Sequence, residues 1–176
     1  MAFGGSSLTI ASFMKSMGHN RIVHTAIDLA QTSYWDNVAD DALARAGLRD
    51  LVQVVEKPSS IALAAMLEAG ERFDFCYVDG SHQFEDVFVD FYFVARMLDV
   101  NSIVLFDDST DKHVAKVIKF IRRNYREVFD EINLSEYVTD RSRKLRRYAA
   151  SLCGKVQLTG FRKREEGNAS LRFQEF

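Results

Sequence analysis

The sequence has few cysteines, no long apolar run and almost no net charge. Its two cysteines, Cys76 and Cys153, lie far apart without CxxC or metal-ligand spacing, which is typical of reduced thiols in a cytosolic protein. No apolar run approaches the roughly 20 residues that a membrane helix needs, and no charged segment followed by an apolar one opens the chain. We therefore expect inert packing thiols and a cytoplasmic protein without a membrane partner.

The near balance of charge limits the partners. A formal net charge of -2 and a pI near 6.1 disfavour a general binder of nucleic acids or anionic membranes, because neither sign dominates. The basic residues 141–147 could contact phosphates, but such a run is more often the solvated face of a helix. We expect a small-molecule substrate and no nucleic acid, and we leave a homo-oligomer open.

Apolar strands alternate with amphipathic helices along the chain. The helices are predicted at residues 8–17, 36–45, 61–69, 84–98, 112–125 and 136–150, and the strands at 21–27, 51–55, 73–78, 102–106, 128–134 and 155–163. This alternation predicts an α/β fold, a Rossmann-like three-layer sandwich with a mostly parallel sheet. The length suits a single domain over residues 1–176, in which we expect the tail at 164–176 to be partly loose.

Acidic residues follow three of the predicted strands, where open parallel sheets bind their ligands. They are Asp28, Asp79 and the adjacent pair Asp107 and Asp108, and His82 follows Asp79 by three positions. Because adjacent aspartates at the end of a buried strand repel one another without a cation, Asp79, Asp107 and Asp108 predict a divalent metal site. In the alternative, Asp108 caps the next helix and Asp107 faces solvent.

His82 has two interpretations at this edge of the sheet. A neutral imidazole near a bound hydroxyl can accept its proton as the hydroxyl becomes a nucleophile. A lone histidine is also commonly a polar surface residue. Its position beside Asp79 makes it our candidate catalytic base.

A glycine pair, Gly4 and Gly5, precedes the first predicted helix. It supplies a tight turn through which a ligand can approach a helix N-terminus, although a plain loop explains it as well. Ser6 or Ser7 can cap that helix. Asp28 lies some two dozen residues later, at the spacing where a carboxylate accepts hydrogen bonds from a ribose diol; capping of the next segment is the alternative.

On these residues the sequence resembles the class I S-adenosylmethionine-dependent O-methyltransferases. It is most similar to the group related to macrocin and rhamnosyl O-methyltransferases and the cephalosporin-biosynthesis methyltransferase. The resemblance covers residues 1 to about 125, and its most specific motifs are Val78-Asp79-Gly80-Ser81-His82 and Phe106-Asp107-Asp108.

The resemblance implies S-adenosylmethionine as the cofactor, with the glycine pair at its methionine end and Asp28 at its ribose. It also places Ser59 and Ser60 by the adenine, although Lys57-Pro58 precede them where the family usually has Gly-x-Ser. The expected cofactor-binding residues are Gly4, Gly5, Ser6, Asp28, Ser59, Ser60 and Asp79.

The same resemblance implies that Asp79, Asp107 and Asp108 ligate Mg²⁺ or another divalent cation and that His82 deprotonates the acceptor hydroxyl. The predicted function is metal-assisted O-methylation of a small molecule such as a sugar or a natural product. A nicotinamide-dependent oxidoreductase is disfavoured, because the glycine turn lacks the G-x-G-x-x-G spacing.

One departure from the family concerns the fold. The family's first strand, which ends in Glu-x-Gly and is central in the expected sheet, should lie just before Ala2. Its loss would leave two neighbouring strands with unpaired edges, a serious cost inside a domain. We therefore expect Met1 to be an internal residue of a longer protein, or another segment to fill the gap. The alternative to an active enzyme is a non-catalytic Rossmann-like binding or assembly domain.

Overall fold

The computed structural model describes residues 3–21, 24–140, 157–167 and 173–176. Its contacts divide the chain into two compact units, Met1–Ala65 and Met66–Phe176. Among the residues so described, no helix is long and apolar enough to cross a membrane. Cys153 and the basic residues 141–147 lie outside the described residues.

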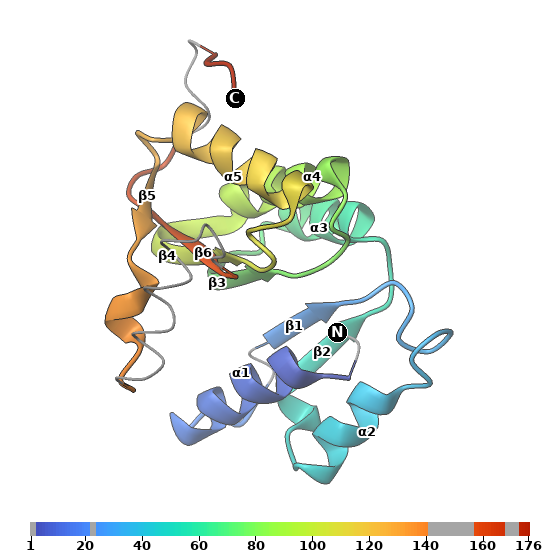
Figure 1. Ribbon diagram of the computed structural model, residues 1–176. Coiled ribbons are helices and arrows are strands. Elements are labelled where there is room, and N and C mark those ends of the chain that lie inside the picture. The colour runs from blue at the N-terminus through green and yellow to red at the C-terminus, as the bar shows by residue number, and fades with distance from the viewer. Residues whose placement is uncertain (1–2, 22–23, 141–156, 168–172) are drawn as a thin grey trace. The chain divides into compact units, whose positions relative to one another are not determined.

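The first unit contains a two-stranded parallel sheet. Its elements are α1 (Gly5–Ser16), β1 (His24–Ile27), α2 (Val38–Arg45), the 3₁₀ helix η1 (Arg49–Leu51) and β2 (Val52–Val55), as Figure 1 shows. β1 and β2 pair with His24 opposite Val52 and Ile27 opposite Val55. The buried core between the helices and these strands consists of Ala11, Ala26, Leu43, Leu48, Leu51 and Val52.

A left-handed glycine starts α1. Gly4 has φ +80° and is the N-cap residue, and a Cβ at this position would lie 3.0 Å from the Cβ of Ala39. The prediction that Ser6 or Ser7 caps this helix is wrong, because the turn at Gly4 places both serines inside the first helical turn. Ser7 Oγ instead lies 3.1 Å from His24 Nε2 and so joins α1 to β1.

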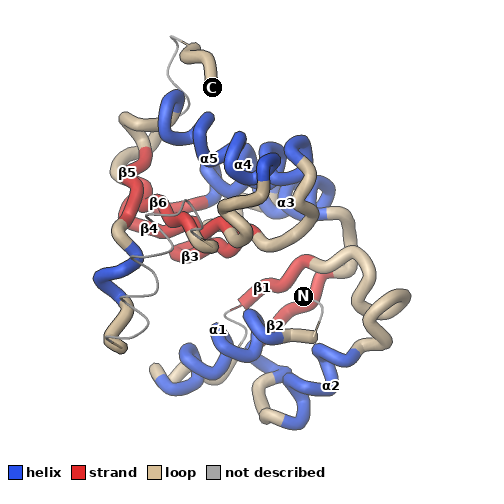
Figure 2. The backbone as a smooth tube through the Cα atoms, in the orientation of Figure 1, coloured by secondary structure: helices blue, strands red, loops and turns tan. Residues whose placement is uncertain are grey.

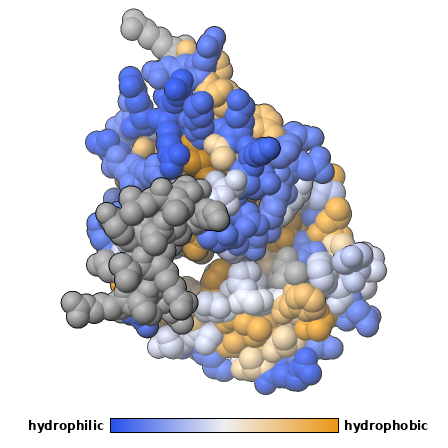
Figure 3. All heavy atoms as spheres, viewed as in Figure 1, coloured by the Kyte–Doolittle hydropathy of each residue, from blue (hydrophilic) through white to orange (hydrophobic). Residues whose placement is uncertain are grey.

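Hydrophobic residues gather on one part of the surface of the first unit, as Figure 3 shows. Phe13 and Met17 are both exposed, and an open groove beside them is lined by Leu8, Thr9, Ser12, Phe13, Ser16, Ala46 and Leu48. Exposed apolar patches are typical of contact surfaces. The homo-oligomer left open by the sequence stays a prediction.

The second unit contains a four-stranded sheet with the order β3-β4-β6-β5. Helix α3 (Ser59–Glu68) spans the boundary between the units and is followed by β3 (Phe73–Val78), α4 (Phe84–Met97), β4 (Leu98–Phe106), α5 (Lys112–Asn124), β5 (Phe129–Ile132), the 3₁₀ helix η2 (Leu134–Tyr137) and β6 (Thr159–Lys163). β3 and β4 are parallel, whereas β6 runs antiparallel to β4 and β5. This Rossmann-like α/β arrangement, with β1 to β4 in parallel pairs, confirms the predicted fold class.

Helices α4 and α5 lie together over the four-stranded sheet (Figure 2). Phe91 of α4 and Ile118 of α5 are almost fully buried and pack against Phe106 and Phe161 of the sheet. Burying one such side chain stabilises a fold by about 1.5–3 kcal/mol. This core fixes the carboxyl ends of β3 and β4, where the candidate site lies.

β1 and β3 each pair with a single neighbour among the described residues, whereas β4 pairs with β3 on one side and β6 on the other. The sequence analysis named open edges on two neighbouring strands as the cost of a missing first strand, and the expectation of a longer protein or of another segment in that place stays a prediction. An apolar strand with an open edge leaves backbone groups available for another strand.

One prediction for the C-terminal third needs correction. The predicted helix at 136–150 is wrong at its start, because residues 134–137 form η2 and residues 138–140 are not helical; residues 141–150 lie outside the described residues. The tail, which was expected to be partly loose over 164–176, makes contacts with α4 and α5 at residues 173–176. Asn124 of α5 donates to the carbonyl of Gln174 and accepts from its amide (3.0 and 2.8 Å), and Phe176 stacks on Phe84 of α4.

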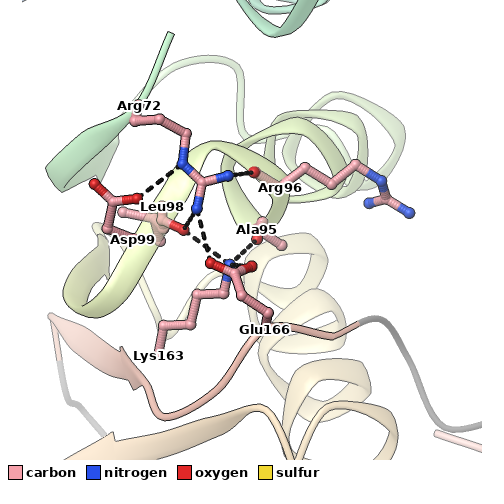
Figure 4. Close-up of polar contacts among 7 residues, drawn as sticks. All are labelled: Arg72, Ala95, Arg96, Leu98, Asp99, Lys163 and Glu166. Carbon is pink, nitrogen blue, oxygen red and sulfur yellow. Dashed lines mark hydrogen bonds and ion pairs between the residues drawn. The ribbon is translucent and has the colours of Figure 1, made fainter. Parts of the chain in front are cut away.

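A lysine buried at the carboxyl end of α4 holds the last helical carbonyls (Figure 4). The Lys163 side chain is 1 % exposed, and its Nζ donates to the carbonyls of Leu98 and Ala95 at 2.8 and 3.3 Å. The same ammonium lies 2.6 Å from a carboxylate oxygen of Glu166. A cation at this end of a helix also complements the helix dipole.

Arg72 extends this network across the surface. Its guanidinium pairs with Asp99 and with Glu166, each at 2.8 Å, and donates to the carbonyl of Arg96 at 3.0 Å (Figure 4). The end of α4 is therefore joined to β3, β4 and the residues after β6.

Candidate active site

The predicted acids of the second unit meet at one edge of its sheet. Asp79 directly follows β3, and Asp107 directly follows β4. Because the two strands are parallel neighbours with Val78 opposite Phe106, their carboxyl ends coincide, and the Asp107 amide donates to the Val78 carbonyl at 3.0 Å. The structure thus confirms that these two strand ends lie side by side.

The carboxylate of Asp107 is half-buried and accepts three hydrogen bonds. The phenol of Tyr77 donates to Oδ2 at 2.6 Å, and the amide of Asp108 and the side chain of Gln157 donate to Oδ1 at 2.8 and 3.2 Å. The alternative in which Asp107 simply faces solvent is therefore wrong.

Asp108 has a left-handed backbone, with φ +44°. Its carboxylate accepts a hydrogen bond from Gln157 on one oxygen, and the other oxygen lies 3.3 Å from His82 Nε2. The alternative in which Asp108 caps α5 is wrong, because Asp111 is the N-cap residue and accepts from the amide of His113 at 2.8 Å. Asp108 is therefore free to contact the imidazole.

His82 lies in the turn between β3 and α4, and its side chain is 42 % exposed. Gln83, the next residue, donates its amide to Ser81 Oγ at 3.2 Å, and the amide of Phe84 donates to His113 Nδ1 at 3.2 Å. These bonds fix the turn around His82, while its exposed imidazole stays accessible to a ligand. The structure thus brings His82 to Asp108, whereas the sequence associated the imidazole with Asp79.

Burial and like charge act on the ionisable groups of this edge. Burial, followed by the negative charge of Asp107, raises the pKa of Asp79 above its usual value. Burial, followed by the hydrogen bond to Asp107, raises the pKa of Tyr77 well above its usual value. Tyr77 is therefore a protonated phenol at neutral pH and a permanent hydrogen-bond donor.

The residues of the predicted metal site have suitable ligand atoms, but their side chains are not arranged around a common point. Carboxylate oxygens are the ligands that hard divalent cations prefer. Within the described part of the chain, however, no three His, Cys, Asp or Glu side chains are arranged to hold a metal ion. The oxygens of Asp107 and Asp108 are directed to Tyr77, Gln157 and His82 instead. Metal binding by Asp79, Asp107 and Asp108 therefore stays a prediction.

Most of the predicted cofactor residues lie in the first unit. Gly4 and Gly5 form the turn at the start of α1, Ser6 lies in its first turn, and Ser59 and Ser60 begin α3 after β2. A Cβ at Gly5 would meet no atom within 4 Å, so space is open beside this turn. Backbone amides at the start of a helix have no partner within the helix and can donate to a ligand.

Asp28 lies at the end of β1, as predicted. Its amide donates to the carbonyl of Val55 at 3.1 Å, and its Oδ1 accepts from the amide of Ala30 at 2.9 Å. A second acid at this edge, Glu56, was not predicted; it follows β2 and accepts from the Thr32 amide at 2.9 Å. Its position directly after a predicted strand was the signal that could have identified it.

Tyr77 and Gln157 were also missed in the second unit. Tyr77 lies inside an apolar strand, where the sequence pattern indicates a packing residue. Gln157 is close to Asp107 and Asp108 only because β6 returns beside β4. Nothing local in the sequence indicated either contact.

The glycine turn and both acidic strand ends lie within the segment of the chain that matches a known family. A family model described as a methyltransferase domain matches residues 1–109, which is more than half of the chain. The sequence matches none of the curated proteins.

Solved structures share the fold. The cofactor-bound protein Rv0187 from MTB has a TM-score of 0.63 at 18% identity, with 94% of this chain and 71% of that chain covered. The O-methyltransferase TomG from Streptomyces achromogenes, involved in tomaymycin synthesis and solved with SAM, has a TM-score of 0.61 at 19% identity over 93% and 70%. A putative rRNA methylase from Clostridium thermocellum has a TM-score of 0.59 at 13% identity over 92% and 86%. At these identities the likeness concerns the fold alone.

Proposed function

Since the chain belongs to the methyltransferase-domain family, we propose that it transfers a methyl group from S-adenosylmethionine to a hydroxyl group of a small molecule. The observation that carries this proposal is the 3.3 Å contact between His82 Nε2 and the carboxylate of Asp108 at the end of β4. The similar fold of TomG, an O-methyltransferase solved with SAM, supports the cofactor and the hydroxyl acceptor.

S-adenosylmethionine supplies an activated methyl group on a sulfonium and leaves as the neutral thioether. The protein's task is to hold the acceptor oxygen in line with that methyl group and to remove the hydroxyl proton. His82 performs the second task. An Nε2–H directed at Asp108 leaves Nδ1 with its lone pair, and Nδ1 accepts the proton from the acceptor.

Asp108 gives His82 its orientation. A carboxylate beside one ring nitrogen fixes which nitrogen carries the hydrogen and which one is available to accept a proton. The exposed position of the imidazole allows a small acceptor to reach Nδ1 from solvent.

The cofactor-binding residues keep the roles that the sequence suggests. The amides at the start of α1 donate to the methionine end, because Gly4 turns the chain there and no side chain at Gly5 occupies the adjacent space. The carboxylate of Asp28 accepts from the ribose hydroxyls. The proposed contacts are Gly4, Gly5, Ser6, Asp28, Ser59, Ser60 and Asp79.

The proposal also includes the class of acceptor, the location of the protein and a divalent cation, each supported by a single feature. The nearly balanced charge favours a small acceptor such as a sugar or a natural product over RNA, and a cytoplasmic location fits the reduced thiols. A divalent cation at Asp79, Asp107 and Asp108 is supported by the like charge that acts on Asp79. The reaction steps above involve only the protein's own residues.

Calorimetry and methyl transfer test the proposal together. We expect the full chain to bind S-adenosylhomocysteine and to transfer labelled methyl groups to hydroxylated small molecules rather than to RNA. His82→Gln should abolish transfer without weakening S-adenosylhomocysteine binding, whereas His19→Gln, at an exposed histidine of the first unit, should change neither.

The possible outcomes separate the rival functions. Failure to bind S-adenosylhomocysteine would overturn the proposal. Binding without transfer to any acceptor would favour the non-catalytic domain, and labelled RNA would replace the small acceptor. Equal activity with chelator and with added Mg²⁺ would contradict the predicted cation.

A further inference from the structure

We propose that Tyr77 and Gln157 are positioning residues that hold the adjacent pair Asp107 and Asp108 from the two strands beside β4. This inference rests on the proposed function and deepens it. It adds two residues that touch neither acceptor nor cofactor and act through the acid pair and His82.

Tyr77 holds the pair from the β3 side. Tyr77 pairs with Leu105 in the parallel ladder between β3 and β4. Its phenol donates to Oδ2 of Asp107, two residues beyond Leu105, at 2.6 Å. Phenylalanine would fit the same apolar environment without donating. The hydroxyl therefore has a specific task, since the loss of one such donor leaves a half-buried carboxylate oxygen unsatisfied.

Gln157 holds the pair from the opposite side. Phe106 of β4 faces Thr159 of β6 in an antiparallel ladder, so two further steps place Gln157 across from Asp108. Its carbonyl accepts from the amide of Ser109 at 2.9 Å, which anchors its backbone. Its side chain amide donates to both aspartates, to Asp107 at 3.2 Å.

The backbone at Asp108 shows why such support is needed. A non-glycine residue with φ +44° is in a sparsely populated conformation that the surrounding structure has to maintain. Gln157 engages one oxygen of its carboxylate, and the other faces His82. Gln157 thus acts on His82 through Asp108, as residues that orient a catalytic base do.

This chain of contacts from Tyr77 and Gln157 through the acid pair to His82, here called the relay, should affect the rate of catalysis but not the affinity for the cofactor. Neither residue belongs to the glycine turn, Asp28 or the start of α3. Loss of either donor should therefore lower kcat and leave cofactor affinity unchanged. A role in packing alone would lower stability without a selective effect on kcat.

The test compares two single-atom or isosteric variants with matched controls. Tyr77→Phe removes only the donating hydroxyl, whereas Gln157→Glu replaces the donating amide by a carboxylate and so also adds a negative charge beside the acid pair. Tyr137→Phe and Gln53→Glu make the same changes at exposed positions away from the acid pair. We expect kcat to fall by about 10 to 100-fold in the first two variants, while their affinity for S-adenosylhomocysteine stays unchanged. In the two control variants, kcat, this affinity and the thermal midpoint should all stay unchanged.

A spectroscopic readout keeps the inference testable without turnover. The ring ¹⁵N signals of His82, measured at one pH, should shift in Gln157→Glu and stay constant in Gln53→Glu. Unchanged kcat and unchanged His82 signals in Gln157→Glu would overturn the relay. If the wild-type chain neither binds S-adenosylhomocysteine nor turns over, the proposed function fails, and the His82 signals alone decide the positioning role.

Discussion

Lys163 and Glu166 form a 2.6 Å ion pair in which the lysine side chain is 1 % exposed and the glutamate side chain is 59 % exposed. The two partners therefore do not contribute equally. Lys163 also satisfies two backbone carbonyls at the end of α4, whereas Glu166 lies largely in water.

Removal of the lysine should cost much more than removal of its partner. Lys163→Met leaves the carbonyls of Ala95 and Leu98 without their donor and should lower the free energy of unfolding by roughly 1–3 kcal/mol. Glu166→Gln should cost less than about 1 kcal/mol, because water screens an exposed carboxylate. Urea unfolding of both variants measures the difference, and equal losses would show that the ion pair, rather than the carbonyl contacts, stabilises this end of α4.

The two glycines before α1 should respond differently to the same substitution. Gly4→Ala places a Cβ 3.0 Å from that of Ala39 at φ +80° and should lower the free energy of unfolding by about 1–3 kcal/mol. Gly5→Ala meets no neighbouring atom and should leave stability unchanged or slightly raised.

The same pair tests the cofactor site. If the ligand occupies the space beside Gly5, Gly5→Ala should weaken binding of S-adenosylhomocysteine in calorimetry although the variant is stably folded. Undiminished binding by Gly5→Ala would place the methionine end of the cofactor elsewhere.

His24 should make the first unit less stable in mild acid. Burial lowers its pKa below the usual 6.5 in the folded protein, so the unfolded chain takes up a proton at pH values where the folded chain resists it. The free energy of unfolding should therefore fall as the pH drops below about 6.5. Denaturant unfolding between pH 8 and pH 5.5 measures the slope.

A histidine comparison isolates that effect. His24→Gln should flatten the slope, because glutamine has no proton to gain, whereas His19→Gln should keep the wild-type slope. A slope that is identical in wild type and His24→Gln would refute the assignment.

Cys76 should be an unreactive thiol. Burial raises its pKa to about 12, so almost no thiolate exists at pH 8, and thiolate is the reactive form. In a Cys153→Ser background, Cys76 should react with a disulfide reagent at least about 100-fold more slowly than free cysteine. Unfolding in denaturant should restore the ordinary rate, and fast reaction of the folded protein would contradict the burial.

The sequence predicts features that depend on neighbouring residues. The strand at 73–78 and the start of α5 at Lys112 agree with the structure, because an apolar run bounded by turn residues and a helical period are local signals. The acids after β3 and β4 were found in the same way. Parallel strands bring such ends together whatever the details of packing.

Features that depend on distant residues were missed. The cap of α1 is a left-handed Gly4 whose space is limited by Ala39, so the serines that resemble caps lie inside the helix. Gln157 reaches Asp108 only through the register of β6 against β4. Tyr77 is an apolar strand residue by pattern, and its hydroxyl gains a role only when β4 lies beside it.

The order of the sheet also constrains how the second unit is made during synthesis. β6 lies between β4 and β5, although residues 159–163 leave the ribosome after both. Among the described residues β5 pairs with β6 alone, so it has to wait for a strand that emerges later. A chain that ends before residue 157 lacks both Gln157 and β6, so an edge of β4 is exposed. Such a fragment should aggregate rather than persist as a smaller domain.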